Sequence, residues 1–191
     1  MYQISKEGKN LHGNINISGS KSESNRLLTL RAYTSFFNIN NLSDSDDTKT
    51  MISSLKSDKE EINIGHAGTA MRFLTSYYSS TLNSSKILTG SSRMKERPIL
   101  ILVEALNNLG ADIEYIDRKG YPPIKINGKL LYGDEIALPA DVSSQYISSL
   151  MMLGVSINQG LKIKLSTKIT SLPYIHTVSY THLTLPTKVS V

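Results

Sequence analysis

The chain has 191 residues, of which 39% are hydrophobic and 19% are charged, with a net charge of +5. This composition is typical of a soluble globular protein with one or two domains. The absence of cysteine excludes disulfides, thiolate metal sites and a cysteine nucleophile. No apolar run is long enough to cross a bilayer, and the N-terminal residues do not resemble a signal peptide. We therefore expect a cytoplasmic protein that does not bind membranes.

The positive charge has three possible explanations: a solvated lysine-rich surface, a field that attracts small anions, or nucleic acid binding. The basic residues are scattered along the chain, which has no arginine-rich arm, zinc-finger spacing or RNP-type aromatic motif. The sequence therefore disfavours nucleic acid as a partner.

Strand-like and helix-like patterns alternate along the chain. Apolar residues at every second position predict strands, and apolar residues spaced by three or four positions predict helices. In chain order, we first predict a strand at 10–19, a helix at 21–37, a turn and short helix within 40–57, and a loop and helix within 65–80. Residues 85–115 should form a strand, a helix, a turn at Gly110 and a second strand. We then predict strands at 121–128 and 135–140, a helix at 141–157 and a strand at 161–169. This order predicts the α/β or α+β class.

A glycine and an arginine recur at the same spacing at the start of several predicted helices. Each pair follows a predicted strand, so repeated units of this kind would bring several helix N-termini towards one place. The pairs are Gly19 and Arg26, Gly65 and Arg72, and Gly90 and Arg97.

The stretch "GSKSESNR" (19–26) places many hydrogen-bond donors at the start of a helix. Helix N-termini bind anions through free N–H groups and a partial positive charge. Lys21 would add a point charge, Ser22 a hydroxyl, and Arg26 a bidentate donor one turn further on. The alternative is an ordinary cap by Ser20 or Ser22 with solvated basic residues.

The stretch "GHAGTAMR" (65–72) has the same character. Backbone N–H groups near Gly68 could approach an anion closely, and Thr69 and Arg72 add a hydroxyl and a charge. The alternative is a glycine turn followed by a helix cap. His66 has no second histidine or carboxylate at metal-ligand spacing, so we interpret it as a loop residue.

Two further helix entries carry polar groups. "SSRMKERP" (91–98) has three basic residues, including Arg97, and we expect Pro98 in the first helical turn. "DVSSQY" (141–146) offers Asp141 as a cap and Ser143, Ser144 and Gln145 as neutral donors. Each stretch alone fits a solvated turn or a cap, but four such entries together favour binding of small phosphorylated, carboxylated molecules.

The sequence contains no evident Ser-His-Asp arrangement, paired carboxylates, P-loop or dinucleotide fingerprint. Taken together, however, an ordered set of motifs within the first 175 residues resembles the 5-enolpyruvylshikimate-3-phosphate synthase (3-phosphoshikimate 1-carboxyvinyltransferase) family. The sister family, UDP-N-acetylglucosamine enolpyruvyl transferase, typically has a Lys-Asn pair at the first motif and often a catalytic cysteine. This chain has Lys21–Ser22 and no cysteine. The motifs are "GSKSESNR", "GHAGTAMRFL", "LTGSSRMKERPI", "LVEALNNLGADI", "GYPPIKING", "DVSSQY" and "TSLPYI".

The resemblance implies transfer of the enolpyruvyl group of phosphoenolpyruvate to the 5-hydroxyl of shikimate 3-phosphate, with release of phosphate. It implies no metal or organic cofactor, and a monomer at full length. His66 stands where many members have asparagine. The residues implied for shikimate 3-phosphate are Lys21, Ser22, Arg26, Ser143, Ser144, Gln145, Ser171 and Tyr174, and those for phosphoenolpyruvate are Lys21, Gly68, Arg97 and Gln145.

The resemblance also implies a two-lobed, inside-out α/β barrel in which each lobe has three βαβαββ units. On this basis residues 1–17 hold a first strand that pairs with a second lobe, and 18–175 form an incomplete N-terminal lobe. Residues 176–191 depart from the family and are interpreted as a non-native tail. The catalytic acid–base residues are expected in the second lobe, so we expect this chain alone to be inactive. A non-catalytic module that binds a phosphorylated ligand is the alternative.

Overall fold

The computed structural model describes residues 8, 13–35, 37–139, 141, 143–167, 169 and 172–180. The helices are α1 (Lys21–Thr34), α2 (Asp46–Leu55), α3 (Gly68–Ser80), α4 (Ser92–Lys95), α5 (Leu100–Asn108), α6 (Ser144–Leu153) and α7 (Leu172–Val178), with a 3-10 turn, η1 (Gly154–Ser156). The strands are β1 (Glu61–Asn63), β2 (Ser85–Thr89), β3 (Asp112–Tyr115), β4 (Ile124–Asn127), β5 (Glu135–Leu138) and β6 (Lys162–Leu165).

The strands form two sheets. The larger has the order β1-β2-β4-β3, in which β1 and β2 are parallel and the other neighbours are antiparallel. Strands β5 and β6 form a separate parallel pair. This mixture of helices with parallel and antiparallel strands confirms the predicted α/β (α+β) class.

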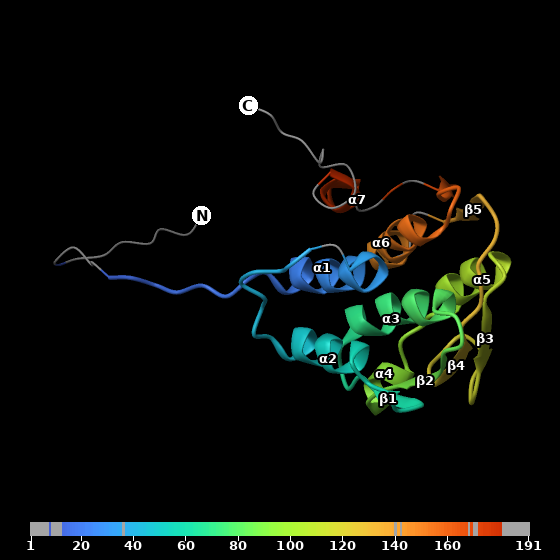
Figure 1. The fold of residues 1–191 in the computed structure, drawn as a ribbon, viewed down its shortest axis with the longest axis horizontal. Helices are drawn as coiled ribbons and strands as arrows, with labels where there is room; N and C mark the ends of the chain where they lie inside the picture. The colour runs from blue at the N-terminus through green and yellow to red at the C-terminus, as the bar shows by residue number, and fades with distance from the viewer. Residues whose placement is uncertain are drawn as a thin grey trace.

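Helix α3 is the central helix of the fold. It packs against α1, α2, α5 and α6 and against β2 and β4, and Figure 1 shows it between α1 and the larger sheet. Its side chains Met71, Phe73 and Leu74 are almost completely buried. Because helices and strands pack around α3, this packing fixes the position of its first residue, Gly68.

Helices α3 and α6 run parallel. In their first turns, the Gln145 Nε2 group donates to Thr69 Oγ1 at 3.4 Å. Further along both helices, Ser76 Oγ and Ser149 Oγ lie 2.7 Å apart in a buried hydrogen bond. Because early residues contact early residues and later residues contact later ones, both N-termini lie at the same end.

Helix α1 begins at that end too. Its first residue, Lys21, lies 3.7 Å from Asp47 in the first turn of α2. In the last turns of α1 and α3, the rings of Tyr33 and Tyr77 meet edge to face with centroids 5.5 Å apart. The prediction that several helix N-termini come together is therefore confirmed for α1, α3 and α6.

Two local predictions differ from the structure, at the N-terminal segment and at Pro98. Residues 13–20 form no strand with any described residue, and Ile15 and Ile17 are exposed. Pro98 precedes the first turn of α5, because Ile99 is the N-cap and the helix begins at Leu100. Pairing of the first segment with a second lobe stays a prediction.

The cap of α6 also differs from the prediction. Ser143 is the N-cap, and its Oγ accepts from the Gln145 backbone N–H. The Asp141 carboxylate instead accepts a hydrogen bond from Thr167 Oγ1 at 3.0 Å. A serine next to the first turn can reach a helical N–H, whereas the aspartate two positions earlier fastens the loop before α6 to the segment after β6.

The last described residues, 172–180, include helix α7. This helix runs to Val178, which is buried, so the first residues of the segment 176–191 extend a regular element. Residues 181–191 lie outside the described part. Among the described helices, none is long and apolar enough to span a membrane.

Candidate anion-binding site

Two arginines converge on the first residue of α3. A Cβ atom at Gly68 would lie 2.5 Å from Arg97 Nη1 and 3.0 Å from Arg72 Nη1. A side chain at this position would displace at least one of the two guanidinium groups. The start of a 13-residue helix carries free N–H groups and a partial positive charge. Three sources of positive potential therefore meet at one point.

Arg72 is held firmly in this place. Its Nη1 donates to the Gly68 carbonyl oxygen at 2.7 Å, and its guanidinium carbon lies 5.3 Å from the ring centroid of Tyr146 on α6. Its Nε is buried and has no hydrogen-bond partner among the described residues. No described carboxylate forms an ion pair with Arg72 or Arg97. The positive charge here is thus not neutralised within the described part of the chain.

The start of α6 lies beside this arginine pair. Gln145 reaches Thr69, the neighbour of Gly68, and the Tyr146 hydroxyl donates to the carbonyl oxygen of Pro98, the neighbour of Arg97. Three predicted phosphoenolpyruvate-binding residues from separate motifs are therefore brought together by the fold: Gly68, Arg97 and Gln145.

The loops after β1 and β2 border the same place. The Ser91 N–H donates to the Gly65 carbonyl oxygen at 3.0 Å, and Ser91 Oγ is hydrogen-bonded to His66 Nδ1 at 2.8 Å. Because β1 and β2 are parallel, both loops leave the same edge of the sheet. In α/β sheets, ligands bind outside the carboxyl ends of the strands.

A second group of predicted residues meets between α1 and α7. Arg26 is 5% exposed, and its Nη1 donates to the Tyr174 hydroxyl at 3.0 Å. Its guanidinium carbon lies 5.4 Å from the Tyr174 ring centroid. The interpretation of Arg26 as a solvated residue is therefore wrong, because the side chain is buried against one of its predicted partners.

The start of α1 is capped in the ordinary way. Ser20 is the N-cap and accepts from the Glu23 N–H. Ser22 is exposed, while Lys21 pairs with Asp47 and keeps half of its side chain exposed. The cap and an anion site are compatible, because the cap occupies one N–H of the first turn and leaves others free.

The remaining predicted residues lie near these groups or outside the description. Ser143 is exposed and Ser144 is half-buried at the start of α6. Ser171 lies outside the described residues. Helix α1 packs against both α3 and α6, so the Gly68 group and the Arg26 group belong to neighbouring helices.

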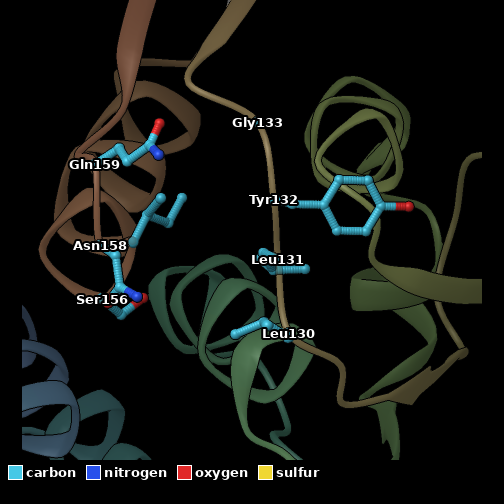
Figure 2. Close-up of a pocket in the computed structure, with 8 residues that line it drawn as sticks. Leu130, Leu131, Tyr132, Gly133, Ser156, Asn158 and Gln159 are labelled. Carbon is cyan, nitrogen blue, oxygen red and sulfur yellow. The ribbon is translucent and has the colours of Figure 1, made fainter.

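Two cavities of the described chain lie away from the Gly68 site. Figure 2 shows one of about 190 Å³ between the segment Leu130–Gly133 and the turn containing Asn158 and Gln159. Another, of about 450 Å³, lies between the C-terminal halves of α1 and α2 and includes Tyr77. Neither of these two cavities is lined by a predicted site residue.

Several groups outside the predicted set of site residues have perturbed pKa values. Burial raises the pKa of Tyr115 to about 12, and a hydrogen bond from Lys129 lowers the pKa of Asp112. Hydrogen bonds from Lys164 and Lys162 lower the pKa of Glu135. No group of three or more metal-ligating side chains occurs within the described ranges.

Comparisons with known proteins identify the family of this chain. Residues 52–181, more than half of the chain, match the family of EPSP synthase (3-phosphoshikimate 1-carboxyvinyltransferase). The chain belongs to the EPSP synthase family. The resemblance seen in the sequence motifs is thereby confirmed.

Relatives that carry the name 3-phosphoshikimate 1-carboxyvinyltransferase are found in several bacteria. The Bacteroides fragilis protein is 50% identical over 163 residues, which cover 85% of this chain and 40% of the relative. The Haemophilus influenzae protein is 37% identical over 194 residues, covering 86% of this chain and 45% of the relative. The chain thus spans about two fifths of the length of these relatives.

A solved structure shares the fold. EPSP synthase from Acinetobacter baumannii superposes with a TM-score of 0.64 at 22% identity, covering 76% of this chain and 38% of that chain. This match confirms the enolpyruvyl transferase fold for the region that superposes.

Sequence reasoning missed the part of Arg72 in the Gly68 site and the contact between His66 and Ser91. Arg72 belongs to the motif at 65–72 but not to the predicted binding set, and the structure places it beside Arg97. The repeated glycine–arginine spacing was the available signal, because both arginines of the second and third pairs reach Gly68. The contact between His66 and Ser91 joins two loops and had no signal in the sequence.

Proposed function

We propose that this chain supplies part of the substrate-binding surface of an enzyme that transfers the enolpyruvyl group of phosphoenolpyruvate to the 5-hydroxyl of shikimate 3-phosphate and releases phosphate. The observation that carries the proposal is the pair of unneutralised arginines at Gly68. The names of the relatives support the same reaction.

Phosphoenolpyruvate would place its phosphate at the start of α3. Arg97 and the free N–H groups near Gly68 would donate to its oxygens, and Arg72 would add charge from the other side. Gln145 lies close enough to contact a ligand there, since it already reaches Thr69. Lys21 would join after exchanging its exposed ion pair with Asp47 for the ligand.

Shikimate 3-phosphate would bind along the starts of α1, α6 and α7. Arg26 donates to the Tyr174 hydroxyl, which leaves the hydroxyl proton of Tyr174 free to be donated to a ligand. The exposed serines would donate to the phosphate of this substrate. The proposed set is Lys21, Ser22, Arg26, Ser143, Ser144, Gln145, Ser171 and Tyr174.

The reaction needs more than binding. An acid must protonate the enol carbon, and a base must remove the hydroxyl proton of shikimate 3-phosphate. Glu96 is the one carboxylate within residues 90–98, and it is exposed. A site that no second lobe covers would also leave water around the developing charge, which would weaken electrostatic stabilisation. We therefore propose that this chain alone binds the substrates without turnover.

Titration calorimetry with phosphoenolpyruvate tests the binding proposal. Arg97→Ala should weaken binding by about 1.5–3 kcal/mol, the range for a hydrogen bond to a charged group. Arg31→Ala is the matched control, because Arg31 is an exposed arginine in the last turn of α1, at the other end of the helices. Equal affinities of the wild type and Arg97→Ala would refute the proposed site.

A phosphate-release assay tests the second part. We expect no phosphate release above background when this chain is given both substrates. Release that requires both substrates and is abolished by Lys21→Ala would show that the chain is catalytic by itself.

A further inference from the structure

Tyr146, in the first turn of α6, contacts the segments that carry both arginines of the Gly68 site. Its hydroxyl donates to the carbonyl oxygen of Pro98, the residue after Arg97. The guanidinium carbon of Arg72 lies 5.3 Å from the centroid of its ring. The side chain is only 5% exposed, and its one hydroxyl hydrogen is already used within the protein. Tyr146 would therefore act on a ligand through the two arginines.

The hydroxyl of Tyr146 holds the backbone that follows Arg97. The Pro98 carbonyl and the Ile99 N–H belong to one planar peptide unit. While the carbonyl accepts from Tyr146 on α6, the Ile99 N–H donates to the Gly120 carbonyl oxygen in the loop between β3 and β4 at 2.8 Å. On the other side, the Arg97 N–H donates to a carbonyl oxygen of α4 at 3.0 Å. The backbone on both sides of Arg97 is thus fixed, and the bond from Tyr146 ties it to α6.

The ring of Tyr146 holds the other guanidinium group. Arg72 Nη1 donates to the Gly68 carbonyl oxygen, and an aromatic ring within about 6 Å attracts a cation of this kind. Helix α6 also holds the backbone of Arg72, because Ser149 Oγ donates to its carbonyl oxygen at 2.9 Å. One side chain of α6 therefore restrains Arg72 through its ring and the Arg97 segment through its hydroxyl.

We propose that Tyr146 is a positioning residue of the Gly68 anion site, whose hydroxyl fixes the direction from which Arg97 enters and whose ring holds the guanidinium of Arg72. The inference rests on the proposed function of that site. Two like charges repel each other, so neighbouring groups must hold them side by side. Guanidinium groups that are already in place lose little freedom when an anion binds, which raises the affinity. The affinity should therefore depend on two separable parts of one side chain.

Tyr146→Phe tests the role of the hydroxyl, because it keeps the ring. Pro98 is exposed, so water can bond to its carbonyl oxygen in the variant and the loss of stability should be small. We expect phosphoenolpyruvate to bind about fivefold more weakly, the equivalent of one hydrogen bond. The affinity for shikimate 3-phosphate should not change, because its proposed partners Arg26 and Tyr174 meet each other between α1 and α7. Calorimetry with each ligand measures this split.

NMR signals of the arginine side chains show which arginine each part of Tyr146 holds. In Tyr146→Phe, the Nε–H signal of Arg97 should move and that of Arg72 should stay in place. Tyr146→Leu also removes the ring, so both signals should move. Its affinity for phosphoenolpyruvate should fall by about two- to fivefold beyond that of Tyr146→Phe, the range for one cation–π contact.

Tyr78→Phe is the matched control. Tyr78 is 4% exposed, and its hydroxyl donates to the Ser54 carbonyl oxygen at 2.7 Å, in the last turn of α3. Its loss should leave the affinity for phosphoenolpyruvate unchanged, whatever it does to the thermal midpoint. The site stands and the role of Tyr146 is refuted if Arg97→Ala weakens binding while Tyr146→Phe binds like the wild type, weakens both ligands alike, loses no more than Tyr78→Phe, or leaves the Arg97 signal in place. If the wild type does not bind phosphoenolpyruvate, or Arg97→Ala binds it equally well, the site and the role of Tyr146 are both refuted.

Discussion

Gly68 is the residue on which the site depends most. Its missing side chain lets two guanidinium groups approach the start of α3, and a methyl group there would overlap Arg97 Nη1 at 2.5 Å. That atom is the end of a flexible side chain, so the cost to folding is small, while the geometry of the anion site is lost.

We predict that Gly68→Ala binds phosphoenolpyruvate about tenfold more weakly, the loss of one charge-assisted hydrogen bond. Its thermal midpoint should stay close to that of the wild type. Calorimetry and thermal unfolding measure the two quantities. An unchanged affinity would mean that Arg97 does not need its present position.

Tyr174 gives a second test at the residue scale. Tyr174→Phe keeps the ring beneath Arg26 and removes only the hydroxyl that accepts from Nη1. We expect shikimate 3-phosphate to bind about 1 kcal/mol more weakly, the net contribution of one hydrogen bond. Titration with shikimate, which lacks the phosphate, would show whether the lost binding energy comes from contacts with the carbocyclic ring or with the phosphate.

At the level of elements, the arrangement depends on parallel helices joined by small polar side chains. Ser149 Oγ donates to the Arg72 carbonyl oxygen at 2.9 Å, and Ser76 Oγ lies 2.7 Å from Ser149 Oγ. Small side chains let the two helices approach closely, so the contact sets the distance between Gly68 and Gln145.

We predict that Ser149→Ala destabilises the fold by about 1–3 kcal/mol, because the buried Ser76 hydroxyl loses its partner. Ser76→Ala/Ser149→Ala should recover part of that loss, since neither side chain then leaves an unpaired hydroxyl. Urea unfolding of the two single variants and the double variant measures the coupling. Strictly additive losses would show that the two hydroxyls do not interact.

A carboxylate on β3, at the edge of the larger sheet, should make the folding stability depend on pH. The Lys129 hydrogen bond lowers the pKa of Asp112 on β3. A lowered pKa contributes stability above the unfolded value of about 3.9, and this is lost as the pH falls through the folded value. Asp112→Asn should therefore be less stable than the wild type at neutral pH, and the difference should vanish in strong acid. Asp58→Asn, at an exposed carboxylate without an ion pair among the described residues, should show no such difference.

Most elements could be predicted because their signals are local. Alternating apolar residues predicted strand β6, and a glycine–arginine motif predicted the start of helix α3. The prediction of Asp141 as the cap of α6 is wrong, because Ser143 is an equally good cap residue. The Asp141 carboxylate accepts a hydrogen bond from Thr167 Oγ1 instead. The order β1-β2-β4-β3 and the pairing of His66 with Ser91 depend on contacts between distant segments, which no local pattern encodes.

In the molecule as a whole, four motifs that are far apart in sequence lie at the same end of the packed helices. Helices α1, α3 and α6 begin there, and the turn that holds Arg97 lies beside them. The chain spans about two fifths of the relatives it matches. We expect the part of the site that this chain supplies to bind anionic ligands without excluding water from them.

The most direct test is to map the backbone amide NMR shifts of the isotope-labelled chain as phosphoenolpyruvate is added with shikimate 3-phosphate present. The account predicts that the largest changes cluster at residues 66–69 and 143–146 and around Arg97, and that Arg97→Ala abolishes those caused by phosphoenolpyruvate. Changes centred on the cavity beside Tyr132, or shifts in the Arg97→Ala variant equal to those of the wild type, would contradict it.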